Sequence, residues 1–141
     1  MITYRHATGE DAEAVLELWS RAAEDSGRPA DKADALLVAI GRDPHALELA
    51  LDGDAIVGTL LSGFDGWRCA LYRLAVDPAH RSAGIAGALL EHAEQRFRDL
   101  GATRSLAMVL DANELGAGFW RSHGYEPQSE WSRWAKNLAP Q

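Results

Sequence analysis

The alternation of apolar and polar residues changes period several times along the chain, and each change predicts a new element. Residues 2–4 alternate as in a short strand, and apolar residues then recur every three or four positions, which predicts a helix with one buried face. Thr8 and Asp11 have the spacing of a capping box at the start of this helix. The predicted buried stripe consists of Ala12, Val15, Leu16, Trp19 and Ala23.

A second helix is predicted after a break. Ser-Gly-Arg-Pro at residues 26–29 interrupts the helical period, and Asp31 with Asp34 is suited to begin a new helix. Arg-Asp-Pro at residues 42–44 ends it, because proline cannot continue a helix. The predicted core positions of this helix are Leu36, Leu37 and Ile40.

Three strands follow. Apolar runs at residues 47–51 and 55–61 flank Asp52-Gly53, which predicts a hairpin because glycine supplies the positive φ of a tight turn. Asp65-Gly66 predicts another turn before residues 68–76. This last run is apolar with little alternation, as expected of a strand that is covered on both faces.

The remaining pattern alternates helix and strand. A long helix is expected at residues 85–100 with Gly101 as its C-terminal cap, followed by a strand at 105–110, a short helix at 114–122 that stops near Gly124, and a last strand at 131–138. The core stripe of the long helix is Ile85, Leu89, Ala93, Phe97 and Leu100. The element order β-α-α-β-β-β-α-β-α-β predicts a mixed α/β fold.

Composition narrows the class of protein. The 141 residues suit one domain spanning 1–141, with 47% hydrophobic and 25% charged residues. A net charge of −7 does not suit nucleic-acid binding, which needs a basic face. The acidity is mildly compatible with a cationic amine substrate, but we interpret it first as a contribution to solubility. No apolar run has membrane-spanning length and no signal-peptide layout is present, so we expect a cytoplasmic protein without membrane partners.

The stretch AVDPAHRSAGIAGALLEHAEQRF at residues 75–97 passes from strand to helix through a short loop of small residues and one arginine, Arg81. The first N–H groups of a helix lack backbone partners and attract anions, and small side chains allow an oxygen to approach them. The loop therefore suits a pyrophosphate, or is an ordinary strand-to-helix turn. It has neither the P-loop lysine nor the Gly-x-Gly-x-x-Gly of dinucleotide-binding folds.

LYRLAVDPAHRSAGIAGALL, residues 71–90, resembles motif A of the GCN5-related N-acetyltransferases (GNAT), whose signature is Arg/Gln-x-x-Gly-x-Gly/Ala. The segments GTLLSGFDGWRCALYRLAVDP and GFWRSHGYE, together with Asn113, are similar to the small YpeA-like acetyltransferases. The resemblance covers nearly the whole chain. It implies the GNAT fold, a central mostly antiparallel sheet of six to seven strands flanked by about four helices, with strands 4 and 5 splayed.

The resemblance also implies acetyl-CoA as co-substrate, with no metal, since no Cys/His spacing suggests one. The pantetheine arm would lie along the fourth strand, whose N–H groups would bind it and polarise the thioester carbonyl. The loop and helix start would hold the pyrophosphate, and Asn113 would touch the pantetheine. The implied cofactor-binding residues are Leu74, Ala75, Val76, Arg81, Ser82, Ala83, Gly84, Ile85, Ala86, Gly87, Asn113 and Trp120.

The chain departs from the family at three positions. Trp120 stands where many members have a tyrosine that protonates the leaving thiolate, and an indole is no acid at neutral pH. Ala70 stands where many relatives have a glutamate base, and Ala83 where a basic residue is common. The catalytic acid and base are therefore unknown, and the remaining candidates are Tyr125, His123 and Tyr72.

Other polar and aromatic residues have structural as well as functional interpretations. Asp65, Trp67 and Arg68 either line the acceptor pocket or serve the turn alone. We interpret the single cysteine, Cys69, as a small buried hydrophobe rather than a nucleophile. Trp131 and Trp134 are expected in the core, with a sheet face or a dimer contact as alternatives.

The sequence predicts an N-acetyltransferase that moves an acetyl group to an amine of a small molecule or peptide by direct attack. A non-catalytic CoA-binding regulatory module is the alternative, motivated by Trp120 and Ala70. A nucleotide- or other phosphate-binding domain is a third possibility. The identity of the amine, the length of the acyl chain and the formation of a homodimer are left open.

Overall fold

The computed structural model describes residues 1–22 and 31–138. The predicted turn at 26–29 and the predicted core residue Ala23 lie outside these ranges. The chain divides into two compact units, Met1–Met108 and Val109–Gln141. The first unit holds the sheet and three α-helices, and the second holds one α-helix.

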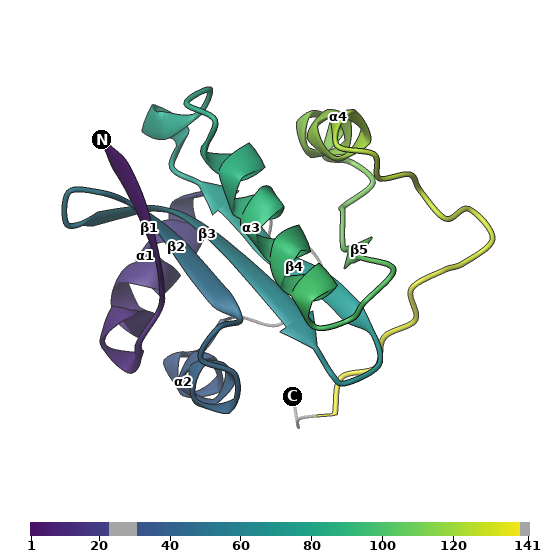
Figure 1. Cartoon of the computed structure of the whole chain (residues 1–141), viewed down its shortest axis with the longest axis horizontal. Coiled ribbons are helices and arrows are strands. Elements are labelled where there is room, and N and C mark those ends of the chain that lie inside the picture. The colour runs from purple at the N-terminus through teal and green to yellow at the C-terminus, as the bar shows by residue number, and fades with distance from the viewer. Residues whose placement is uncertain (23–30, 139–141) are drawn as a thin grey trace. The chain divides into compact units, whose positions relative to one another are not determined.

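The sheet of the first unit has five strands in the order β1-β2-β3-β4-β5 (Figure 1). Their bounds are β1 Ile2–His6, β2 Leu47–Asp52, β3 Ala55–Phe64, β4 Cys69–Val76 and β5 Leu106–Ala107. The first four strands are antiparallel neighbours, and β5 runs parallel to β4. This confirms the mixed α/β fold with a mostly antiparallel sheet, although the described residues form five strands instead of six or seven.

The strand predictions near the C-terminus were wrong in extent. The strand expected at 105–110 contains only Leu106 and Ala107, and the segment 131–138 forms no strand in the described chain. Trp131 and Trp134, expected in the core, are 74% and 93% exposed. Alternation of apolar residues produces a strand only where a neighbouring strand offers hydrogen bonds, and none pairs with this segment in the described chain.

The helices begin and end at residues with local capping roles. A 3-10 turn, Gly9–Asp11, leads into α1 (Ala12–Ala22), and the backbone N–H of Thr8 donates to the Asp11 carboxylate at 2.8 Å, as the capping box requires. The helix α2 (Ala33–Arg42) begins after Lys32 and has Asp34 in its first turn, whereas Asp31, the other residue predicted to start it, lies before the helix. The Asp31 carboxylate instead pairs with the Arg73 side chain of β4.

The helix α3 (Ile85–Asp99) ends as predicted at Gly101, which has φ 88°. The N–H of Gly101 donates to the Arg98 carbonyl at 3.0 Å, and that of Ala102 to the Phe97 carbonyl at 2.9 Å. These two bonds form a Schellman motif, which uses glycine because only glycine adopts positive φ without a steric cost. The predicted turns at Gly53 and Gly66 also have positive φ, 62° and 96°.

Two layers of helices cover the sheet, and adjacent residues of β3 separate them. An added Cβ at Gly58 would meet Ile85 of α3, whereas the Thr59 side chain contacts Trp19 of α1. Successive strand residues face opposite sides, so α3 packs on one face and α1 on the other (Figure 1). The buried stripes agree with the prediction in most positions. The exceptions are the exposed Leu37 and Leu100, the partly buried Leu16, and the buried Leu18 and Leu90.

Among the described residues, no helix combines the length and the apolar character that crossing a membrane requires.

Candidate functional site

The candidate site begins at a β-bulge in β4. Thr59 of β3 stands opposite Ala75, and Leu61 stands opposite Tyr72, so β4 advances three residues where β3 advances two. The extra residue is Arg73, with φ 55°, a left-handed conformation that a residue with a Cβ rarely adopts. The bulge changes which backbone groups of β4 face its neighbours.

Beyond the bulge, one edge of β4 has no strand partner among the described residues. The pairing with β5 involves only Ala70 and Leu71, at the beginning of β4. The N–H of Asp77 donates to the Val57 carbonyl of β3 at 2.8 Å, so this group points toward β3. Backbone groups alternate along a strand, and therefore the N–H groups of Leu74 and Val76 point toward the edge that β5 does not occupy.

The loop after β4 is tied to the rest of the first unit. Asp77 accepts from the Ala79 N–H at 2.9 Å and pairs with Arg21 of α1 at 3.0 Å. The backbone bond and the Arg21 contact lower the pKa of Asp77. His80 Nε2 lies 3.0 Å from the Asp52 carboxylate of β2. These contacts fix the position of the loop, and therefore that of residues 81–84, which follow it.

Those next residues lead into the N-terminus of α3. Ser82 and Gly84 both have positive φ, 71° and 78°, and residues 81–84 are exposed. The first α-helical hydrogen bond after the loop runs from the Ala88 N–H to the Gly84 carbonyl at 3.1 Å. The N–H groups of residues 85–87 therefore precede the helical ladder, as at every helix start.

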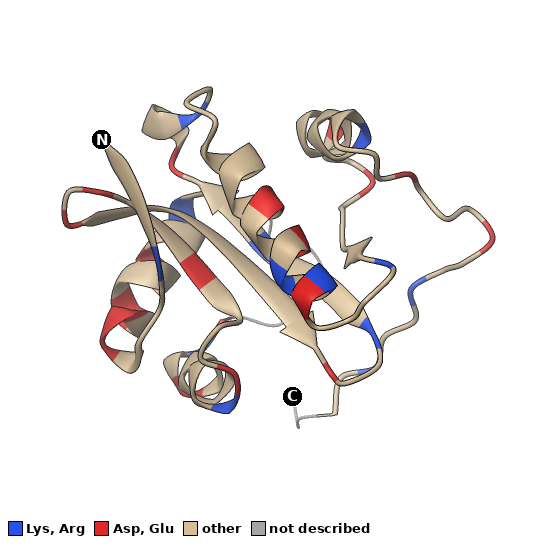
Figure 2. Cartoon of the chain, viewed as in Figure 1, with Lys and Arg blue, Asp and Glu red and all other residues tan. Residues whose placement is uncertain are grey.

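Space and charge at this helix start favour an anion. An added Cβ at Gly84 would meet nothing within 4 Å, so the approach to the N–H groups is open. The first turn of α3 carries no acidic side chain and is drawn tan in Figure 2, and the basic Arg81 lies in the loop that precedes it. Arg81 Nε lies 3.4 Å from the Val76 carbonyl, so this cation lies beside the end of β4.

Close packing brings α3 to the sheet. Ile85 is buried, and an added Cβ at Gly58 would lie 2.8 Å from Ile85 Cγ2 and 3.4 Å from Leu89 Cδ1. The distance to Ile85 Cγ2 is too short for a real side chain, so glycine at position 58 permits the approach. The start of α3 and the unpaired edge of β4 both belong to the first unit, and this packing fixes α3 against the sheet.

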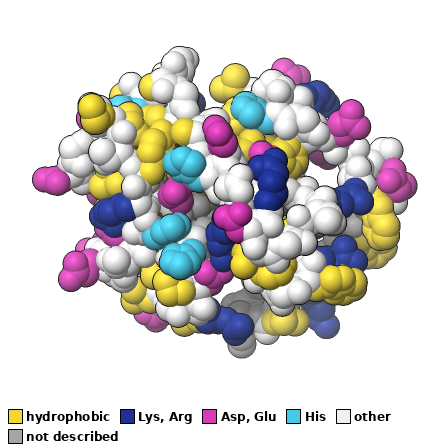
Figure 3. Space-filling model, viewed as in Figure 1, with side chains coloured by type: hydrophobic (Ala, Val, Ile, Leu, Met, Phe, Trp, Pro, Cys, Tyr) yellow, Lys and Arg dark blue, Asp and Glu magenta, His cyan; other side chains and the backbone are white. Residues whose placement is uncertain are grey.

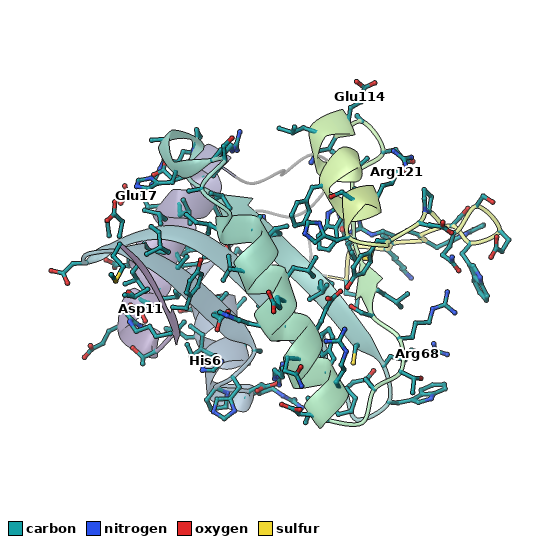
Figure 4. All side chains as sticks on the ribbon, turned by 45° about the horizontal axis from the view of Figure 1, so that its top comes forward. His6, Asp11, Glu17, Arg68, Glu114 and Arg121 are labelled. Carbon is teal, nitrogen blue, oxygen red and sulfur yellow. The ribbon has the colours of Figure 1, made fainter. Side chains whose placement is uncertain are left out.

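The residues predicted for the acceptor pocket form a turn. The Asp65 carboxylate accepts from the N–H groups of Arg68 at 2.7 Å and Trp67 at 2.8 Å, and these bonds lower the pKa of Asp65. The Arg68 guanidinium lies 4.2 Å from the Trp67 ring centre and projects away from the sheet (Figure 4). Trp67 is 78% exposed. The turn accounts for Asp65, whereas the side chains of Trp67 and Arg68 pack on each other at the surface.

Within β4, Tyr72 and Cys69 differ in environment. Tyr72 is 44% exposed and its ring lies 3.4 Å from where a Cβ of Gly63 would stand. Cys69 is buried, and burial raises the pKa of its thiol, which disfavours the nucleophilic thiolate. The interpretation of Cys69 as a small hydrophobe agrees with this burial.

The second unit holds the other predicted residues around α4 (Glu114–Ser122). Asn113 is the N-cap, and its Oδ1 accepts from the Gly116 N–H at 2.9 Å. The helix ends at Gly124, φ 90°, in a second Schellman motif, with the Tyr125 N–H donating to the Trp120 carbonyl at 3.0 Å. The rings of Trp120 and Tyr125 pack edge to face at 5.0 Å, the apolar contact typical of this motif.

His123 is exposed and held by its own helix. Its Nδ1 lies 2.9 Å from the Phe119 carbonyl, and its ring lies 4.3 Å from the Phe119 ring. With Nδ1 engaged in this way, Nε2 is the nitrogen that faces solvent or a ligand.

The first unit also has a cluster of histidines, visible in Figure 3. His6, His45 and His92 border a cavity of about 20 Å³, the size of one water molecule. His92 Nδ1 lies 2.7 Å from the Glu48 carboxylate, and His6 packs on His45. The residues that line this cavity do not include any of the loop at residues 77–84.

Three residues that shape the site were not among the predicted site residues: Gly58, Thr59 and Arg73. Glycine inside a strand is a signal of close approach or of a bulge, so Gly58 was detectable. Thr59, a fully buried polar residue in an apolar strand, was a weaker signal. Nothing local marks Arg73 as the bulge residue, since arginine has no preference for positive φ.

Comparison with known proteins identifies the family of the chain. A family model described as the acetyltransferase (GNAT) family matches residues 12–125. The chain is 32% identical over 118 residues to Acetyltransferase ECA0875 of Pectobacterium atrosepticum, covering 83% of this chain and 82% of that protein.

Solved structures are similar as well. The GNAT family protein SP0256 of Streptococcus pneumoniae has a TM-score of 0.72 at 27% identity, with 100% of this chain and 99% of that chain covered. Ard1 of Thermoplasma volcanium has a TM-score of 0.76 at 18% identity, with coverage of 87% and 81%, which shows the common fold alone. Because the family model spans most of the chain and the Pectobacterium relative exceeds 30% identity, the chain belongs to the acetyltransferase (GNAT) family and is an acyltransferase.

Proposed function

We propose that the chain is an acetyl-CoA-dependent N-acetyltransferase that acts on an amine of a small molecule or peptide. One observation carries the proposal: an unpaired stretch of β4 ends in a loop that leaves the first N–H groups of α3 open. An extended pantetheine can pair with this stretch of β4, and a pyrophosphate can bind at the open N–H groups of α3. We further propose that residues 1–141 act as one GNAT domain.

The proposed seat for the pyrophosphate is the run from Arg81 to Gly87. The small side chains of the exposed Ser82 and Ala83, and the lack of one at Gly84, leave room for phosphate oxygens. The helix dipole adds a partial positive charge of about half a unit. Arg81 supplies a full charge. Ala83 is neutral where members of the family often have a basic residue, so we expect a moderate affinity for the pyrophosphate.

The proposed contacts to the pantetheine and the thioester lie on β4. The N–H groups of Leu74 and Val76 point toward the unpaired edge, whereas that of Ala75 points toward β3, so the first two are the proposed donors. A fixed donor aimed at the thioester oxygen acts where negative charge develops, and such a donor typically contributes about 10²–10³ in rate. The amide of Asn113 and the ring of Trp120 are the proposed contacts of the second unit.

Acetyl-CoA supplies an activated acyl group, and the acceptor amine attacks it directly. An alkylammonium has a pKa of about 10.4 and must lose a proton before it attacks. Ala70 cannot take that proton, and Trp120 cannot return one to the thiolate. We therefore propose water as the principal proton carrier, with His123, Tyr125 and Tyr72 as the side chains to be tested.

The test is calorimetric titration of the full chain with acetyl-CoA, followed by release of CoA thiol in the presence of a panel of amines. The proposal expects saturable binding that weakens at least ~10-fold in Arg81→Glu, because the substitution reverses a charge beside the diphosphate. No saturable binding, or binding unchanged in Arg81→Glu, would refute it.

A non-catalytic CoA-binding module is the second candidate, supported by Ala70 and by the burial of Trp120 at the position of the usual acid. This candidate expects the same titration but no amine that accelerates thiol release. Turnover of any amine well above the hydrolysis of acetyl-CoA alone would exclude it.

A further inference from the structure

We propose that Thr59 is a positioning residue for acetyl transfer, because its buried hydroxyl fixes the peptide group between Arg73 and Leu74. That peptide group then presents the Leu74 N–H to the thioester carbonyl. The inference rests on the proposed function and names a residue that fixes the orientation of Leu74, one of its two proposed donors.

Three residues from different elements form a continuous chain of contacts. The Trp19 indole Nε1–H of α1 donates to Thr59 Oγ1 at 2.8 Å, and Thr59 Oγ1 donates to the Arg73 carbonyl at 2.9 Å. Thr59 is fully buried and Trp19 is only 6% exposed. A hydroxyl that accepts one hydrogen bond and donates another has a defined orientation, and no water competes for it.

Planarity transmits this contact to the opposite edge of β4. The carbonyl of Arg73 and the N–H of Leu74 belong to one trans peptide group, so they point in opposite directions. Thr59 lies on the β3 side and holds the carbonyl there. The Leu74 N–H therefore points to the edge that lacks a strand partner among the described residues.

The peptide group needs such a contact because Arg73 has φ 55°. This conformation is disfavoured for any residue with a Cβ, so the bulge persists only where neighbours stabilise it. The Arg73 side chain contributes too: its guanidinium lies 4.8 Å from the Trp19 ring and pairs with Asp31. Thr59 and Trp19 thus bind both the backbone and the side chain of the bulge residue.

The test compares acetyl-CoA with ethyl-CoA, the thioether in which a methylene replaces the carbonyl. Only acetyl-CoA can accept from the Leu74 N–H. For the unmodified protein we expect acetyl-CoA to bind about 3- to 10-fold more tightly, the contribution of one hydrogen bond. Isothermal titration with each ligand measures this ratio and requires no knowledge of the acceptor amine.

In Thr59→Val, which keeps the shape but removes the hydroxyl, we expect the ratio to fall to about 1, with little change for ethyl-CoA. Thr59→Ser keeps the hydroxyl and should retain the preference. Ser62→Ala is the matched control, because Ser62 is a buried hydroxyl of the same strand that donates to the Ala46 carbonyl instead. It should lose stability without losing the preference.

A purely structural role of Thr59 predicts a different result. Both ligands would then weaken equally in Thr59→Val, and the ratio would stay that of the unmodified protein, which would overturn the inference. An unmodified protein that binds both ligands equally would overturn it too, while leaving the proposed function intact. Failure to bind either ligand would refute the proposed function itself.

If Thr59→Val does not fold, Trp19→Phe provides the second measurement. It retains an aromatic ring near Arg73 and removes the N–H that orients the Thr59 hydroxyl, together with part of the buried indole. We expect the preference for acetyl-CoA over ethyl-CoA to fall about 2- to 3-fold below that of the unmodified protein. The Thr59 hydroxyl keeps its bond to the Arg73 carbonyl but loses the hydrogen bond from Trp19 that orients it. An unchanged preference in a folded Trp19→Phe variant would contradict the inference.

Discussion

The two faces of β3 and β4 support the same edge in different ways. On the α3 face, the absence of a side chain at Gly58 lets Ile85 approach, and backbone N–H groups form the open helix start. On the α1 face, the side chains of Trp19, Thr59 and Asp31 hold the bulge at Arg73. The α3 face supports the edge through exposed backbone groups, and the α1 face supports it through buried side chains. We therefore expect added side-chain volume to impair the α3 face and the loss of hydrogen bonds to impair the α1 face.

The largest effect is expected at Gly84. In Gly84→Val, a branched side chain projects into the space before the α3 N–H groups, so we expect acetyl-CoA affinity to fall about 100-fold because the phosphate oxygens can no longer approach. Titration calorimetry measures the loss.

Gly101→Val is the matched control for Gly84→Val. Gly101 lies at the other end of α3, also has positive φ, and an added Cβ there also meets nothing within 4 Å. Both variants should lose similar stability, about 1–2 kcal/mol, but only Gly84→Val should lose affinity. Equal losses of affinity would mean that helix stability, not access to the N–H groups, governs binding.

The next effect concerns Gly58. A methyl group in Gly58→Ala would lie 2.8 Å from Ile85 Cγ2, and α3 must move away from the sheet. We expect the free energy of unfolding to fall by about 1–3 kcal/mol, the usual cost of overpacking a core. Denaturant titration measures the change, and the cost should shrink in an Ile85→Ala background. An undiminished cost there would show that the clash lies elsewhere.

The α1 face should be more sensitive to acid. The Arg5 side chain, with the Thr8 N–H, lowers the pKa of Asp11 from 3.8 to about 2 (Figure 4 labels Asp11). A carboxylate with a lowered pKa stabilises the fold fully above the unfolded pKa near 3.8, and this contribution disappears as the pH falls toward 2.

We therefore expect Asp11→Asn to be destabilised by about 1–2 kcal/mol at pH 7, with the difference from the unmodified protein vanishing between pH 4 and 2. Denaturant titrations across this range measure it. Asp54→Asn, which changes an exposed carboxylate of the β2–β3 turn, should show no such trend. A pH-independent difference for Asp11→Asn would contradict the assignment to the carboxylate.

The smallest effect is expected at the contact that joins the two regions. Arg21 of α1 pairs with Asp77 of the loop at 3.0 Å, and its side chain is 41% exposed. Arg21→Ala should change the free energy of unfolding by less than about 0.5 kcal/mol, as is usual for exposed ion pairs, and weaken acetyl-CoA binding by at most about 3-fold. A large loss of affinity would show that α1 controls the loop directly.

Much of the fold could be predicted from local pattern. Helical periodicity located α3. Gly101 and Gly124 marked the ends of α3 and α4, because glycine adopts the positive φ of a helix C-terminal cap without a steric cost. The prediction of a strand at 131–138 was wrong because a strand also requires a partner strand. Alternation of residues along one segment says nothing about whether such a partner exists. The hydrophobic prediction for Trp131 and Trp134 failed with it.

What the sequence determined by itself is the strand–loop–helix at residues 69–99, because small residues, a prolyl loop and helical periodicity are all local signals. Only the tertiary structure decided which backbone groups this segment exposes. Arg73 adopts its left-handed conformation through Thr59, Trp19 and Asp31, which are distant in sequence. The backbone preference of an arginine is too weak to specify a bulge, so contacts from β3, α1 and the residues before α2 must do so.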